Sequence, residues 1–244
     1  MADTPNYGFH PSPEFTVNHI SEYLATENAL QRTRIIRAAK FPKKVEIAAY
    51  AQIRKSLQAA LSKPEFDRSG LELLADRLST KARRETGYAR DEALRCERAV
   101  RAFIETVQST ALSKLQISPA PSPLRLHQSG VRLKVTMDAA VSSETGGTVN
   151  SGGIVLLYAF SADRGPVKDR LNAMTGLLFW ALEGGQMEPL PRLCLAIDLA
   201  GGEVLRASSS HIRFRQHVAE SCHEIAARWE TIDPPDDYDG PDWR

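Results

Sequence analysis

Three prolines at alternate positions, Pro119, Pro121 and Pro123, constrain the fold of this 244-residue chain more than any other feature. A helix cannot continue through this spacing, because each proline lacks a backbone N–H donor and pushes the preceding residue towards extended geometry. The apolar pattern changes at the same point. Upstream, apolar residues recur about every three or four positions, and downstream they recur every second position. We therefore expect two halves of different architecture, the first helical and the second containing strands.

The half before the prolines is predicted to hold an irregular arm over residues 1–15 and a basic helical domain over residues 16–116. Apolar residues at helical spacing and proline stops predict helices over 16–40, 45–61, 70–79 and 87–115. The last of these has an apolar face and a charged face on which arginines and glutamates alternate. Most of those arginines are therefore expected to form weak ion pairs along an exposed helix surface.

The half after the prolines is predicted to be a small mixed α/β sheet domain over residues 124–230 with the order β-β-β-α-β-β-α, so the fold class is α+β. Alternating or continuous apolar runs predict strands over 124–126, 131–137, 153–160, 193–197 and 203–207. Helices are expected over 167–182 and 210–230, and residues 142–153 are expected to be a loop. The acidic, Pro- and Gly-rich residues 231–244 are predicted to be a flexible tail.

Cysteine usage and the absence of long apolar runs indicate a cytoplasmic protein. The three cysteines, Cys96, Cys194 and Cys222, are odd in number and widely spaced, which favours reduced thiols. The sequence contains no apolar run near the roughly 18–20 residues that a membrane span needs, and residues 1–14 lack the features of a secretory signal. We expect no membrane partner.

Charge is distributed unevenly, although the net charge is only +1. Residues 1–116 carry 19 Lys and Arg against 14 Asp and Glu, whereas the rest of the chain is acidic. The segment 32–55 has a single acid, Glu46, and eight cations: Arg32, Arg34, Arg37, Lys40, Lys43, Lys44, Arg54 and Lys55. Because clustered cations attract phosphates, these eight residues are the predicted nucleic-acid-binding site.

Two other interpretations of the basic segment stay open. Cations accumulate at the carboxyl ends of helices, where they complement the helix dipole. The acidic residues 230–242 could also fold back on the segment or meet a basic surface of a partner protein. Few aromatic residues lie among the cations, so base stacking has little support.

The order of a long helix followed by β-β-β-α-β-β-α resembles the core of the restriction-endonuclease-like nucleases, the PD-(D/E)XK superfamily, and especially its RecB-like branch. The resemblance covers about residues 87–210. In that family an acid ends the second strand and an acid-x-Lys motif lies in the third, and the carboxylates hold Mg²⁺. Asp138 matches the first acid, but residues 154–160 contain neither carboxylate nor lysine. The resemblance therefore implies a nuclease-like fold that has lost catalysis.

Asp138 has a simpler interpretation, which we rank first, as a residue that caps a turn. The metal interpretation would make Asp138 and Glu144 candidate catalytic residues of a residual nuclease, the one case in which Mg²⁺ would be a cofactor. No other metal site is expected, because the histidines and cysteines near the carboxyl end lack the paired spacing of zinc ligands. Residues 194–202 and 224–229 are also similar to parts of small prokaryotic proteins, a resemblance that implies no mechanism.

The leading hypothesis is a non-catalytic nucleic-acid-associated protein, a subunit of a prokaryotic nucleic-acid-processing or defence assembly. The alternative is a protein–protein interaction subunit or homo-oligomer without a nucleic-acid role. A residual metal-dependent nuclease ranks third. The sequence favours a protein that is not an enzyme, because no catalytic motif is complete.

Overall fold

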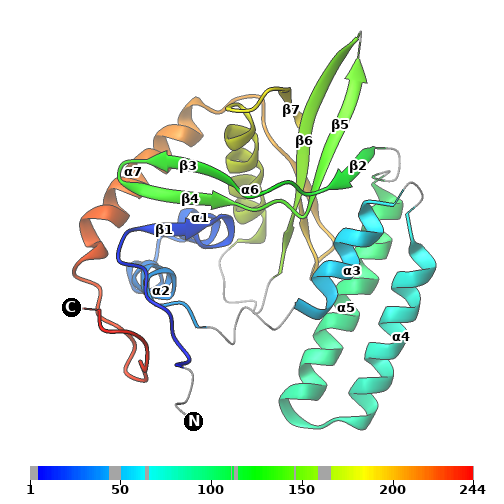
Figure 1. The fold of residues 1–244 in the computed structure, drawn as a ribbon, viewed down its shortest axis with the longest axis horizontal. Coiled ribbons are helices and arrows are strands. Elements are labelled where there is room, and N and C mark those ends of the chain that lie inside the picture. Colours follow the sequence, from blue (N-terminus) through cyan, green and yellow to red (C-terminus); the bar gives the residue numbers. More distant parts are fainter. Residues whose placement is uncertain are drawn as a thin grey trace.

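The computed structural model describes residues 5–43, 51–63, 66–110, 112, 115–145, 147–158 and 166–243. Within these ranges the chain forms seven α-helices and two mixed β-sheets, which confirms the predicted α+β class (Figure 1). The helices are α1 (Val17–Leu24), α2 (Ala29–Lys40), α3 (Ala51–Leu61), α4 (Arg68–Arg84), α5 (Gly87–Ser109), α6 (Val167–Leu182) and α7 (Ile212–Trp229). The strands are β1 (Glu14–Thr16), β2 (Gln116–Pro119), β3 (Leu124–Gln128), β4 (Val131–Val135), β5 (Ala139–Thr145), β6 (Thr148–Leu157), β7 (Glu188–Asp198) and β8 (Val204–Arg206).

The larger sheet has five strands in the order β2-β5-β6-β7-β8. Strands β2, β5 and β6 form an antiparallel meander, and α6 then crosses over so that β7 pairs in parallel with β6. Strand β8 returns as an antiparallel edge. The predicted central strand, the 167–182 helix and the hairpin near 193–207 are therefore confirmed.

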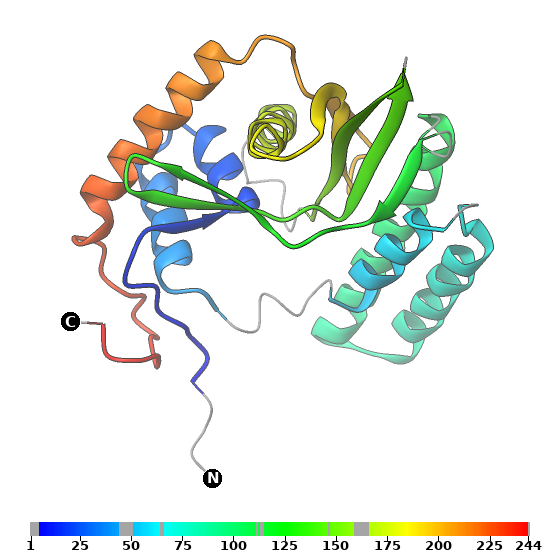
Figure 2. The ribbon, with the colours of Figure 1, turned by 45° about the horizontal axis from the view of Figure 1, so that its top comes forward.

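Helices cover both faces of this sheet, because alternate residues of its central strands are buried on opposite sides. Ile154 and Leu156 of β6 belong to the apolar cluster formed with α3, α4 and α5. Val155 and Leu157 belong to a second cluster, which contains α6 and the N-terminal helices. Figure 2 shows α6 on one side of the sheet and α3, α4 and α5 on the other. The result is a three-layer arrangement with the sheet in the middle.

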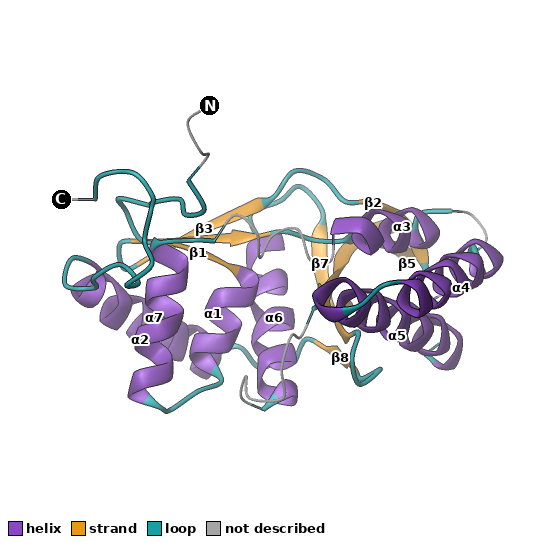
Figure 3. Ribbon diagram, turned by 90° about the horizontal axis from the view of Figure 1, so that it is seen from below, coloured by secondary structure: helices purple, strands orange, loops and turns teal. Residues whose placement is uncertain are grey.

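The smaller sheet has the order β1-β4-β3, with β1 parallel and β3 antiparallel to β4. Ser129 and Gly130 join β3 to β4 with positive φ angles of 47° and 81°. Such angles suit the two-residue turns that connect twisted antiparallel strands. Helices α1, α2, α6 and α7 lie on one side of this sheet (Figure 3).

The N-terminal helices do not form the single helical domain predicted over residues 16–116. Helices α1 and α2 contribute Ile20, Tyr23 and Ile36 to the same core as Trp229 of α7. Helices α3, α4 and α5 pack instead on the other face of the five-stranded sheet. The two groups are separated because their apolar faces are buried against different parts of the C-terminal half. The boundary near residue 116 therefore marks a change from mainly helices to mainly strands. It does not separate two cores, because each core contains elements from both sides of it.

Three local expectations also differ from the structure. The predicted 16–40 helix is divided at residues 25–28, where Asn28 caps α2 by accepting a hydrogen bond from the Gln31 backbone N–H. The predicted loop at 142–153 is mostly the β5–β6 hairpin. Its Gly152 passes so close to Leu193 of β7 that a Cβ atom would have no room. Strand β1 forms within the arm expected to be irregular.

No helix in the described ranges has both the length and the apolar character needed to cross a lipid bilayer.

Candidate functional site

The basic segment predicted to bind nucleic acid is largely occupied by the chain's own carboxyl end. On α2, Arg32 donates to the Thr26 carbonyl over 2.8 Å and forms a 3.1 Å ion pair with Glu224 of α7. The Arg37 side chain donates to the Asp233 carbonyl over 3.0 Å. These contacts hold α2 beside α7 and direct two of the predicted phosphate ligands towards protein oxygens.

Lys40 is the most deeply engaged of the predicted ligands, with only 3% of the residue exposed. Its Nζ donates to the carbonyl oxygens of Trp229 and Ile232, over 2.8 and 3.0 Å. Burial lowers the pKa of Lys40 from its ordinary value, and the nearby carboxylates of Glu230 and Asp233 oppose that shift. Lys40 therefore joins the end of α2 to the end of α7 and is not available to an outside phosphate.

Residues 231–243 pack against the N-terminal arm, which differs from the flexible tail expected for them. Asp237 accepts a 2.7 Å hydrogen bond from the Tyr7 hydroxyl and forms a 3.1 Å ion pair with Lys43. Asp239 accepts hydrogen bonds from the backbone N–H groups of Asn6 and Tyr7. These contacts correspond to the intramolecular interpretation of the acidic residues. We call this packed segment, residues 231–243, the C-terminal clasp.

The remaining predicted ligands are placed differently from these four. Arg34 on α2 and Lys55 on α3 are exposed. Lys44 lies outside the described residues, and Arg54 turns towards Asp138. Of the seven predicted cations in the described ranges, five contact protein groups, so these seven do not form one free patch: Arg32, Arg37, Lys40, Lys43 and Arg54.

Asp138 lies between β4 and β5 and is 1% exposed. Its Oδ1 accepts hydrogen bonds from Arg54 Nε at 2.8 Å and Gln58 Nε2 at 3.0 Å, and its Oδ2 accepts from the Leu156 backbone N–H at 2.8 Å. Burial raises the pKa of Asp138, and the charge of Arg54 opposes that shift. Both carboxylate oxygens are therefore engaged by groups of α3 and β6.

Arg54 is the part of this cluster that solvent can reach. Its side chain is 38% exposed, and its guanidinium carbon lies 5.7 Å from the centre of the Tyr158 ring. The cluster stands where β6 ends, beside the carboxyl end of its parallel neighbour β7. This edge of an α/β sheet is the usual place for a ligand site.

Glu144, the second candidate catalytic residue, lies near the far end of the β5–β6 hairpin and is exposed. Glu144 lies six positions after Asp138 along extended chain, which corresponds to about 20 Å. The two carboxylates cannot share one metal ion over that distance. Within the ranges that the structure describes, no group of three or more His, Cys, Asp or Glu side chains is placed to hold a metal.

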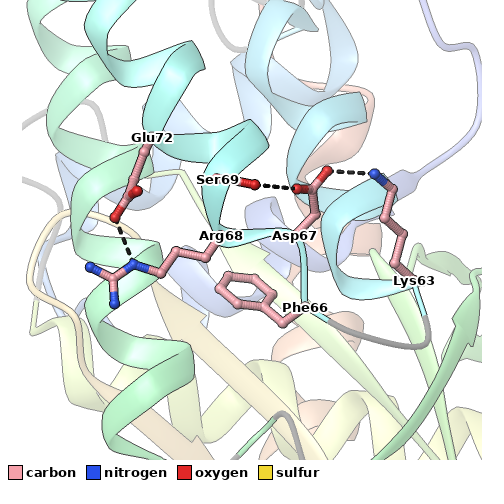
Figure 4. Close-up of a pocket in the computed structure, with 6 residues that line it drawn as sticks. All are labelled: Lys63, Phe66, Asp67, Arg68, Ser69 and Glu72. Atoms are coloured by element: carbon pink, nitrogen blue, oxygen red, sulfur yellow. Dashed lines mark hydrogen bonds and ion pairs between the residues drawn. The ribbon is translucent and has the colours of Figure 1, made fainter.

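A surface pocket at the beginning of α4 is lined by short-range ion pairs (Figure 4). Asp67 pairs with Lys63 and accepts from the Gly70 N–H, and Arg68 pairs with Glu72. Each charged side chain here interacts with a neighbour four residues away. The arrangement is a helix cap with flanking ion pairs, and no unpaired group in it points to a ligand.

All three cysteines are buried thiols outside any disulfide, as expected for reduced cysteines. Burial raises the pKa values of Cys194 and Cys222 to about 12. Because the thiolate is the nucleophilic form, neither thiol is suited to catalysis.

One group of cations that was not among the predicted ligands lies on the smaller sheet. Arg125 and His127 of β3 alternate with Leu124, Leu126 and Gln128, and Arg132 and Lys134 alternate with the buried residues of β4. The register pairs Arg125 with Lys134 and His127 with Arg132, so the four basic side chains share the exposed face. We call this surface the basic sheet face. The sequence pattern that marks this surface is an alternation with period two. Every exposed residue of β3 and β4 is basic.

Comparison with known proteins adds no family: no protein-family model matches the chain, and no curated protein is significantly similar to it.

Proposed function

We propose that the chain is a non-catalytic nucleic-acid-associated protein, built on a nuclease-like core and acting as a subunit of a prokaryotic nucleic-acid-processing or defence assembly. The observation that carries this proposal is the engagement of Asp138 beside the second and third strands of the five-stranded sheet. Asp138, the acid that the resemblance matched to the family's first acid, precedes β5 and accepts hydrogen bonds from Arg54, Gln58 and the Leu156 N–H.

The surroundings of Asp138 support the loss of catalysis in two ways. Residues 154–157 of β6 are all apolar and buried, so the strand offers no second carboxylate or lysine there. Arg54 also places a positive charge 2.8 Å from the carboxylate, where a Mg²⁺ site would need several oxygen ligands. Asp138 serves instead to join α3 to the sheet.

The element order supports a nuclease-like core. A long helix, α5, precedes the meander β2-β5-β6, and α6 then leads to β7 and β8. The β3–β4 hairpin is inserted between the first two strands of the meander and pairs with β1 in its own sheet. The five-stranded sheet thus has three strands, a helix and two strands after α5, but its first two strands are β2 and β5. The strands expected in their place, 124–126 and 131–137, form part of the smaller sheet instead.

The test is a fluorescence-anisotropy titration of the full chain with short single- and double-stranded DNA and RNA, in the presence of Mg²⁺ and at low and physiological salt. A gel run on the same samples reports cleavage. We expect binding that weakens as salt rises, because each phosphate contact releases a counterion, and no cleavage.

Two results would overturn parts of the proposal. No binding at low salt would remove the nucleic-acid role and leave the alternative of a protein–protein interaction subunit. Mg²⁺-dependent cleavage that is abolished by Asp138→Ala and retained by the matched variant Glu144→Ala would show that catalysis persists. Circular dichroism of both variants would establish that they fold.

A further inference from the structure

The exposed face of the smaller sheet carries basic side chains whose charge is only partly compensated by acids. Arg125 and Lys134 stand directly opposite each other in the β3–β4 register, and so do His127 and Arg132. Opposite residues of an antiparallel pair have Cβ atoms about 5 Å apart, and the like charges of Arg125 and Lys134 repel each other at that separation. An anion bound over the face would relieve this repulsion.

Only one acid of the three strands faces these cations. Glu14 of β1 forms a 3.1 Å ion pair with Arg132, whose side chain remains 52% exposed. No ion pair joins Arg125 or Lys134 to an acid in the described parts of the chain. The positive charge is thus greatest at the Arg125–Lys134 end of the sheet, away from Glu14.

The opposite face of this sheet packs against the core. Val131, Leu133 and Val135 of β4 are buried against the core that contains α1, α6 and α7. The Ser129 hydroxyl donates to the Ala219 carbonyl of α7 over 3.2 Å, which fixes the turn. Alternate residues of a strand are about 7 Å apart, so the basic side chains have this spacing along each strand.

We propose that the basic sheet face, Arg125, His127, Arg132 and Lys134, binds the sugar-phosphate backbone of duplex nucleic acid. This inference rests on the proposed function and assigns it a surface. Regularly spaced cations on a flat strand pair are complementary to the regularly spaced phosphates of a duplex.

The character of the face favours this occupant over others. The exposed positions of β1, β3 and β4 hold no Phe, Tyr or Trp on which unpaired bases could stack, so a duplex suits the face better than a single strand. None of the large apolar side chains exposed in the described ranges belongs to this sheet. Protein interfaces and membrane-inserting surfaces usually present such apolar anchors.

The test compares two double variants of the full chain with the same change in charge. Arg125→Glu/Lys134→Glu reverses the basic sheet face. Arg77→Glu/Arg98→Glu reverses two exposed cations of α4 and α5 as a matched control. Anisotropy with labelled duplex DNA and duplex RNA at low salt gives the dissociation constants. We expect the sheet variant to lose at least about tenfold in affinity and the salt slope to fall by about two, with little change in the control.

A further variant separates lost binding from lost folding. Arg125→Thr/Lys134→Thr removes both charges with a residue that favours strands, and it should fold while binding more weakly than the wild type. If the wild type binds and this variant binds equally well, the inference is wrong and the proposed function stands. If the wild type does not bind any duplex, the proposed function itself fails.

Two other results would also overturn the inference. An equal loss in the sheet variant and the Arg77/Arg98 control would mean that binding follows net charge and not this surface. Tighter binding of polyglutamate or of anionic lipid vesicles than of duplex would assign the face to an acidic protein or to a membrane surface.

Discussion

The two basic regions of this chain carry similar charges and differ in what those charges contact. On α2 and just beyond it, Arg32, Arg37, Lys40 and Lys43 interact with α7 and the C-terminal clasp. On the smaller sheet, Arg125 and Lys134 lie opposite each other and face solvent. Several cations of the denser cluster in the sequence are therefore used in contacts within the fold.

This difference shows why charge density along a chain is a weak guide to a binding surface. Cations on a helix that packs against an acidic segment can serve the fold, as Lys40 does by donating to two carbonyl oxygens. Cations on the exposed face of a sheet have no comparable role, because the strands are held by backbone pairing and by the buried face. A binding surface is better sought where charge is left uncompensated.

The largest expected effect comes from Lys40→Met, compared with Lys134→Met. The Lys40→Met variant would keep an apolar stem and leave the carbonyls of Trp229 and Ile232 without their buried donor, at a cost of about 2–3 kcal/mol in the free energy of unfolding. The same substitution at the exposed Lys134 should change stability by less than about 0.5 kcal/mol. Urea unfolding at equilibrium measures both. Equal effects would contradict the structural role assigned to Lys40.

Much of the fold could be predicted from local pattern. The apolar spacing of 167–182 predicts α6 with the bounds that the structure has, and the continuous apolar run near 153–157 predicts the central part of β6. In these segments the residues that determine the structure lie within the segment itself. The β5–β6 hairpin was missed because Ser, Thr, Asn and Gly dominate it. In the structure Val141 of β5 lies opposite Gly152 of β6, and the other edge of β6 pairs with β7. These pairings, which involve residues outside the segment, stabilise the two strands.

The site was harder to predict because its contacts are distant in sequence. Lys40 meets carbonyls that lie 189 and 192 residues further along the chain, and nothing in the local sequence marks that contact. Asp138 was a candidate site residue in the sequence. Its contacts with Arg54 and Gln58, 84 and 80 residues away, could not be read from the strand alone. The basic sheet face had a local signal in its period-two pattern and in the two-residue Ser129-Gly130 turn, which sets the register.

The pH dependence of stability tests the contacts that the C-terminal clasp makes with the N-terminal arm and Lys43. Hydrogen bonds from Tyr7 and Lys43 lower the pKa of Asp237 below its ordinary value of 3.8, and backbone N–H groups of Asn6 and Tyr7 do the same for Asp239. In the unfolded chain both carboxylates return to the ordinary value. Their stabilising contribution is therefore present above pH 3.8 and is lost as the pH falls through the lower folded values.

We expect Asp237→Asn/Asp239→Asn to lower the thermal midpoint at neutral pH, with the difference from the wild type narrowing as the pH falls below 3.8. Asp236→Asn, at an exposed position of the same segment, is the control and should show little difference at either pH. A gap that stays constant down to the lowest pH would mean that the two carboxylates do not stabilise the clasp through their charge.

The smallest expected effect is a rise in the free energy of unfolding when charge is removed from the basic sheet face. Arg125→Thr/Lys134→Thr removes a like-charge pair from opposite positions of β3 and β4 and should raise the free energy of unfolding by about 0.2–1 kcal/mol. The gain should shrink between about 10 mM and about 1 M salt, as the Debye length falls from about 30 to 3 Å. Urea unfolding at the two salt concentrations measures it. A loss of stability would mean that these side chains support the sheet. A salt-sensitive gain would mean that the chain keeps two mutually repelling cations at a cost to its own stability, which is expected of a surface that binds an anionic ligand.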